Sequence, residues 1–77
     1  MSSTHIEIRR ARMLVGLSPS ALAAKVRGVT TATIRRAESD QPGPPIADSH
    51  LKAIRQTLKA LGIEFTPEGP RLREGSD

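Results

Sequence analysis

Two closely spaced helix boundaries limit the folds open to the first half of this chain. Gly16 is followed two residues later by Ser18, and Gly28 is followed two residues later by Thr30. A glycine readily adopts the left-handed conformation that ends a helix, and a serine or threonine side chain caps the first turn of the next one. Pro19 suits the first helical position, where its missing N–H needs no partner. The pattern predicts short helices joined by tight turns.

Apolar residues recur at helical spacing between these boundaries. A first helix is predicted from Thr4 to residue 15, opened by the capping box Thr4-His5-Ile6-Glu7 and buried through Ile8, Ala11, Leu14 and Val15. A second follows Ser18, with Leu22, Ala23 and Val26 as its apolar stripe. A third follows Thr30, with Ile34 and Ala37 inward and Thr31, Ala32, Arg35 and Arg36 outward.

The second half contains one longer helix and a change of period. Residues 40–45 have the composition of a loop, and Asp48 or Ser49 is the expected cap of a fourth helix that ends at Gly62. Apolar and polar residues alternate over residues 63–66 and 71–73, on either side of a turn at 67–70, and this pattern predicts a hairpin. Residues 74–77 are expected to fray. We predict an all-α, four-helix domain over residues 1–62, followed by a short C-terminal strand or hairpin over residues 63–77 that serves dimerisation.

The chain is short, and it lacks the covalent supports common in small domains. A single core in 77 residues rarely supplies more than about 3–5 kcal/mol of stability. The absence of cysteine excludes disulfides and thiolate metal sites. His5 and His50 are far apart with no carboxylate cluster at ligand spacing, so no metal or cofactor is expected. Self-association is therefore the expected support, through Leu58, Leu61, Ile63, Phe65 and Leu72.

Charge is distributed unevenly along the chain. Residues 8–37 hold seven basic side chains and no acidic one, whereas residues 38–77 hold five basic and seven acidic ones. A cationic half predicts a polyanionic partner. Phe65 is the only aromatic residue, so the chain cannot build the stacking platform that single-stranded nucleic acids require. Double-stranded DNA is the partner that remains.

Several function classes receive no support from the sequence. There is no glycine-rich phosphate loop, no cysteine nucleophile and no H-E-x-x-H motif, so we expect the protein not to be an enzyme. No segment approaches the roughly 20 apolar residues of a membrane span, and the N-terminus lacks the apolar core of a secretory signal. A cytoplasmic, nucleoid-associated protein without a small-molecule ligand is the expectation.

Residues 18–38 have the pattern of a helix-turn-helix, in which the second helix enters the major groove of DNA. Leu17-Ser18, Leu22-Ala23, Gly28-Val29-Thr30, Ala32-Thr33-Ile34 and Glu38 resemble the Cro/repressor-type, or XRE, family of helix-turn-helix regulators. The resemblance covers residue 8 to about residue 65. It implies a lambda-repressor-like fold and a homodimer that binds a near-palindromic operator to regulate transcription, most often as a repressor or autoregulator.

The resemblance also implies roles for individual residues. The positions that correspond to base contacts are Thr31, Ala32, Thr33, Arg35 and Arg36, and Ser18 corresponds to a phosphate contact. Arg12 and Glu38 correspond to a structural ion pair between the first helix and the end of the third. From their charge and position, Arg9, Arg10, Lys25 and Arg27 are further candidates for phosphate contacts.

The chain departs from the family pattern at two points. Pro19 stands where the family usually has a phosphate-binding glutamine, and Arg27 has the place of a one-residue insertion in the turn. The charge pattern and the hairpin also fit a second class of function, a protein-interaction module such as an antitoxin or anti-activator that grips a partner through the hairpin. The regulator's output is expected to be set by protein concentration, operator affinity or a protein partner.

Overall fold

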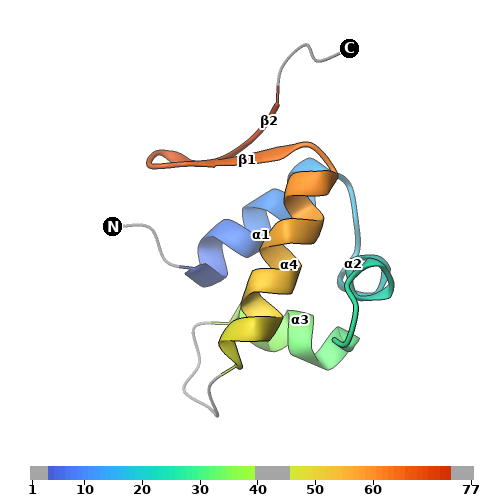
Figure 1. Cartoon of the computed structure of the whole chain (residues 1–77). Coiled ribbons are helices and arrows are strands. Elements are labelled where there is room, and N and C mark those ends of the chain that lie inside the picture. Colours follow the sequence, from blue (N-terminus) through green and yellow to red (C-terminus); the bar gives the residue numbers. More distant parts are fainter. Residues whose placement is uncertain (1–3, 40–45, 74–77) are drawn as a thin grey trace.

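The computed structural model describes residues 4–39 and 46–73, in which four helices are followed by a two-stranded hairpin (Figure 1). The helices are α1 (Thr4–Leu14), α2 (Pro19–Lys25), α3 (Thr31–Ala37) and α4 (Asp48–Ala60), and the strands are β1 (Ile63–Thr66) and β2 (Gly69–Leu72). The number, kind and order of these elements confirm the predictions made for the described part of the chain.

The expected caps set the boundaries of α2 and α3. The Ser18 hydroxyl accepts a hydrogen bond from a backbone N–H three residues on, at 3.1 Å, and Thr30 does the same for α3 at 3.2 Å. Gly16 and Gly28, with φ of 71° and 81°, adopt the left-handed conformation that other residues avoid. The short helices are therefore defined at both ends by local chemistry.

Two expectations, about the cap of α4 and the inward side of α1, are wrong. The N-cap position of α4 is held by Ala47, whose side chain accepts no hydrogen bond, so the predicted cap at Asp48 or Ser49 is wrong. Leu14, expected to face inward, is 42% exposed. The side chain of Thr4, the predicted loop at 40–45 and the tail at 74–77 lie outside the described residues.

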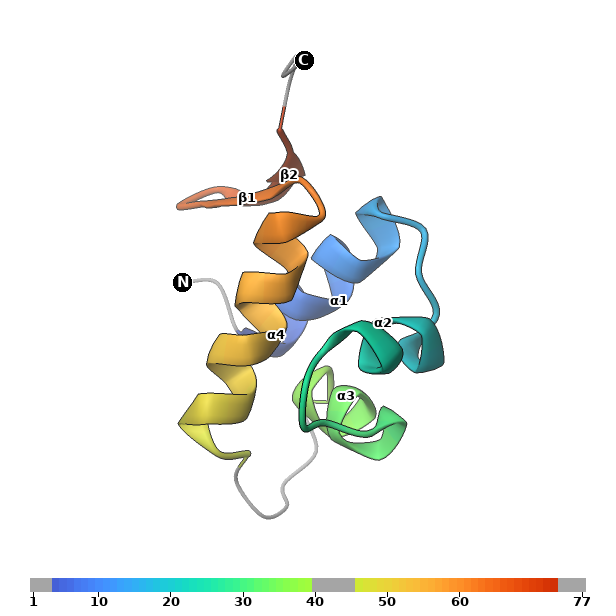
Figure 2. The same ribbon diagram turned by 45° about the vertical axis from the view of Figure 1, so that its right-hand side comes forward.

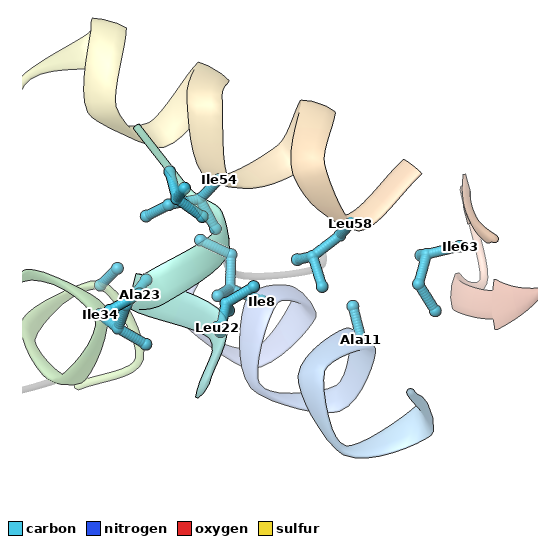
Figure 3. Close-up of a cluster of buried hydrophobic side chains, with 10 residues drawn as sticks. Ile8, Ala11, Leu22, Ala23, Ile34, Ile54, Leu58 and Ile63 are labelled. Carbon is cyan, nitrogen blue, oxygen red and sulfur yellow. The ribbon is translucent and has the colours of Figure 1, made fainter. Parts of the chain in front are cut away.

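A single apolar core joins all four helices to β1 (Figure 3). Its buried members are Ile8, Ala11, Leu22, Ala23, Val26, Ile34, Ala37, Ile54, Leu58 and Ile63. Small alanines in α1, α2 and α3 allow the helices to approach closely, while the larger aliphatic side chains fill the space between them. Because Ile63 is 1% exposed, the hairpin is anchored in the same core as the helices.

The hairpin turns more tightly than the sequence indicated. Thr66 pairs with Gly69, which leaves a two-residue turn, and β2 begins at Gly69 instead of after Pro70. Arg73 donates its N–H to the Gly62 carbonyl at 2.7 Å. Because hydrogen-bonded and non-hydrogen-bonded pairs alternate along an antiparallel ladder, Pro70 falls at a non-hydrogen-bonded position, where its missing N–H costs no ladder bond.

The hairpin and α3 lie at opposite ends of the molecule in both views, with α1 and α4 between them (Figures 1 and 2). The strand β2 packs on α1, β1 packs on α4, and α2 packs on α3. This arrangement separates a helical surface at one end from a mixed helix and strand surface at the other.

Candidate nucleic-acid interface

The helix α3 has one buried side and one exposed side. Ile34 is fully buried and Ala37 is 6% exposed, and both face the core. On the opposite side Ala32, Arg35 and Arg36 are exposed, and Thr31 at the start of the helix is half-buried. We call these four residues, Thr31, Ala32, Arg35 and Arg36, the α3 face. It brings together four of the five residues predicted to contact bases.

The fifth of these residues has a structural role. The Thr33 hydroxyl lies 3.2 Å from that of Thr30, and the Thr33 N–H donates to the same Thr30 oxygen. Thr33 is half-buried, so its side chain belongs to the cap of α3. We therefore assign Thr33 to the cap and leave it out of the α3 face.

Hydroxyl groups connect the beginnings of α2 and α3. The oxygens of Ser20 and Thr31 lie 3.4 Å apart, so the exposed Ser20 stands beside the first residue of the α3 face. Ser18 accepts a backbone hydrogen bond, and its own O–H proton remains able to donate. Sequence reasoning identified Ser18 but missed Ser20. A serine at the second position of a helix does not indicate a binding role until the packing of that helix on its neighbour is known.

A bidentate ion pair fixes α3 to the rest of the protein. Arg12 donates from Nε to one oxygen of Glu38 at 2.6 Å and from Nη2 to the other at 3.0 Å. Its Nη1 donates to the Leu17 carbonyl at 2.8 Å, which adds the turn between α1 and α2 to the network. The Arg12 and Glu38 side chains are only 14% and 9% exposed. The structure confirms this predicted pair, which holds α3 in a fixed orientation.

The remaining cations of the basic half are divided among other surfaces. Arg10 lies near Gly69 of the hairpin, and Arg9 lies on α1 close to Glu38. Lys25 and Arg27 line an open groove of about 530 Å³ against Ala53, Gln56, Thr57 and Ala60 of α4. Ser18, the fifth predicted phosphate contact, lies at the start of α2, where its hydroxyl accepts from the Ala21 N–H.

A second network, which the sequence did not reveal, stabilises the region around the hairpin. Arg55 of α4 donates to Glu7 of α1 at 2.8 Å, and its guanidinium carbon lies 5.3 Å from the centre of the Phe65 ring. Glu7 was expected to take part in a capping box. Arg55 is 48 residues away in the chain, and the packing of α1 on α4 brings the two together. The capping box with Thr4 stays a prediction, because the side chain of Thr4 lies outside the described residues.

The predicted dimer surface requires a correction. Leu58 and Ile63 have 0% and 1% exposure and lie inside the core, so they offer no surface to a partner subunit. Leu61 and Leu72 are 36% and 48% exposed, and Phe65 is half-buried. The helical and strand periods were correct, but which apolar residues point inward depends on how the hairpin packs.

The described residues offer little else with the chemistry of a site. Within residues 4–39 and 46–73, no three histidine, cysteine or acidic side chains gather as metal ligands would. In the same ranges, no helix has both the length and the apolar composition needed to cross a lipid bilayer.

Comparisons with protein-family models, with curated proteins and with solved structures gave no match to this chain.

Proposed function

We propose that this protein is a sequence-specific, double-stranded DNA-binding regulator of transcription that acts as a homodimer. In this proposal residues 18–38 form a helix-turn-helix in a lambda-repressor-like domain. The α3 face enters the major groove, and the hairpin end holds two subunits together. Repression through occlusion of a promoter is the simplest output for a domain of this size.

One observation carries the proposal: α3 is anchored on its inner side and open on its outer side. Its inner residues are in the core, and its C-terminal end is held by the Arg12–Glu38 pair. The exposed side presents hydroxyl, methyl and guanidinium groups together. A rigid helix with such an exposed surface supports groove readout, because base recognition requires side chains held at defined positions.

The chemistry of the α3 face suits base edges. An arginine can donate two hydrogen bonds to O6 and N7 of guanine, and a threonine or alanine methyl can contact the methyl group of thymine. Arg35 and Arg36 supply the first kind of contact in the proposal, and Thr31 and Ala32 supply the second. In the proposal Ser18 and Ser20, at the start of α2, donate to phosphate oxygens beside the groove.

The homodimer is proposed to form at the hairpin end, through Leu61, Phe65 and Leu72. These residues are apolar and at least partly accessible, and the hairpin lies at the opposite end from α3 (Figure 2). Dimers of helix-turn-helix units read half-sites about 34 Å apart, one turn of DNA. We therefore expect the preferred duplex to have two-fold symmetry with that spacing.

Binding selection from random duplexes tests the proposal most directly. We expect a consensus with two-fold symmetry. The logarithm of its binding constant should fall linearly with the logarithm of salt concentration, because phosphate contacts release counterions. The variant Arg36→Ala should change the selected bases. Selection of no sequence above background, or an unchanged consensus with Arg36→Ala, would refute groove readout by the α3 face.

A further inference from the structure

Besides the buried side that faces the core, α1 has a second stripe of apolar residues, which is exposed. Ile6, Met13 and Leu14 are 45%, 60% and 42% exposed, whereas Ile8 and Ala11 on the inner side are fully buried. Ile6, Arg10, Met13 and Leu14 follow at helical spacing, so they share one face of α1. Three large apolar side chains on one exposed helix face are more than scattered surface residues.

This face is hollowed where β2 packs beside it. Arg10, Met13, Leu14 and Pro70 line a mostly apolar groove of about 320 Å³, which we call the α1–β2 groove. A second hollow, lined by His5, Ile6, Arg9, Arg10, Met13 and Glu38, shares Arg10 and Met13 with it. The two hollows therefore adjoin at Arg10 and Met13 of α1.

The charged lining of the α1–β2 groove is positive. Arg10 is its single charged lining residue, and Arg9 stands at the adjoining hollow. Glu38, which also reaches that hollow, is neutralised by its bidentate contact with Arg12. Glu68, in the hairpin turn beside Gly69, is the acidic residue nearest in sequence to β2, which forms one wall of the groove. An apolar floor with arginines along its border is complementary to an apolar segment that carries carboxylates.

We propose that the α1–β2 groove binds a short, acidic, amphipathic helix of a partner protein. A second copy of this chain fits less well, since a two-fold contact at this groove would bring Arg10 of one subunit close to Arg10 of the other. A flat anionic membrane fits less well too, because the apolar residues line a hollow. The groove lies on the side where β2 packs on α1, and α3 lies at the other end of the molecule (Figure 1). The proposal therefore does not involve the α3 face.

The test uses the full chain, labelled with nitrogen-15, and two synthetic peptides of about 15 residues, long enough to form a helix on binding. Both carry leucine at every third or fourth position; one has glutamate at the remaining positions and the other has lysine. We expect the glutamate peptide to shift the amide signals of Arg10, Met13, Leu14 and Gly69 and not those of the α3 face. The dissociation constant should be on the order of 100 μM, because the groove is smaller than a stable interface.

Two substitutions separate the contribution of charge from that of apolar contact. Arg10→Glu should weaken the glutamate peptide about tenfold and strengthen the lysine peptide, since the charge at the border is reversed. Met13→Ser should weaken both peptides, and its exposed position spares the fold. Arg35→Glu, the same charge change on the α3 face, is the matched control and should leave peptide binding unchanged.

Four outcomes overturn the proposal. The first is equal affinity for the two peptides, and the second is no change in any amide signal at about 1 mM peptide. The third is a change in the signals of Met13 and Leu14 that depends on protein concentration alone. The fourth is binding of these residues to phosphatidylglycerol vesicles in preference to the glutamate peptide. The third outcome identifies a second copy as the occupant, and the fourth identifies an anionic lipid surface.

Discussion

The α3 face and the exposed side of α1 are both helical surfaces with two arginines each, but their surroundings differ. On the α3 face the arginines stand beside hydroxyl and methyl groups at one end of the molecule. On α1 they border exposed Ile6, Met13 and Leu14 and the wall formed by β2. Under the two proposals made above, positive charge alone does not define a nucleic-acid surface. Neighbouring side chains decide whether a cation suits base edges and phosphates or an apolar, acidic protein segment.

The largest expected effect comes from removing the anchor on the inner side of α3. Ile34→Ala should lower the free energy of unfolding by about 2–5 kcal/mol, since it leaves a cavity at a fully buried position. Ile6→Ala removes the same atoms from a side chain that is 45% exposed and should cost less than about 1 kcal/mol. Urea denaturation of both variants measures the difference. Equal losses would show that the two faces are not anchored as differently as we describe.

The ion pairs offer a second comparison between a shielded site and an exposed one. Glu38→Gln should lower the free energy of unfolding by about 2–3 kcal/mol, because it leaves the Arg12 guanidinium in a site that is mostly shielded from water. Glu64→Gln removes the equivalent charge from the Arg71 pair, whose side chains are 66% and 45% exposed, and should change stability by no more than about 0.5 kcal/mol. Thermal denaturation of the two variants provides the measurement. A stable Glu38→Gln protein would contradict the role given to this pair.

The arginines themselves should separate the two faces by function. Arg35→Ala should weaken binding to the selected duplex by about 1–3 kcal/mol, roughly 5- to 150-fold, since a bidentate contact to a base is lost. Arg10→Ala should have little effect on duplex affinity. Fluorescence anisotropy with labelled duplex at a fixed salt concentration measures both. If Arg10→Ala proves the more damaging, the surface that contacts DNA includes α1.

The smallest effect tests local capping. Thr30→Ala should cost about 1 kcal/mol, because the N–H groups of the first turn of α3 lose their side-chain acceptor. Ser49→Ala, within the first turn of α4, should cost only a few tenths of a kcal/mol, since α4 has no side-chain cap. Urea denaturation midpoints report both values. A larger loss for Ser49→Ala would restore the cap that the sequence predicted for α4.

Local signals in the sequence determined the helical boundaries and much of the candidate site. Ser18, Thr30, Gly16 and Gly28 act on backbone groups within a few residues of themselves, so their roles could be predicted without tertiary information. The outward placement of Arg35 followed from the helical period once Ile34 was assigned to the core. The Arg12–Glu38 pair was predicted through the family resemblance, because no local rule connects residues so far apart.

Tertiary packing decided the rest. The period of a helix or strand shows which residues share a face, but not how much of that face a neighbouring element covers. Leu58 and Ile63 are therefore core residues while Leu61 and Leu72 remain accessible, and Leu14 is exposed although its spacing placed it inside. The partners of Glu7, the nearness of Ser20 to Thr31 and the α1–β2 groove all arise between segments distant in the chain. Such contacts depend on the positions of whole helices in space, which no short stretch of sequence specifies.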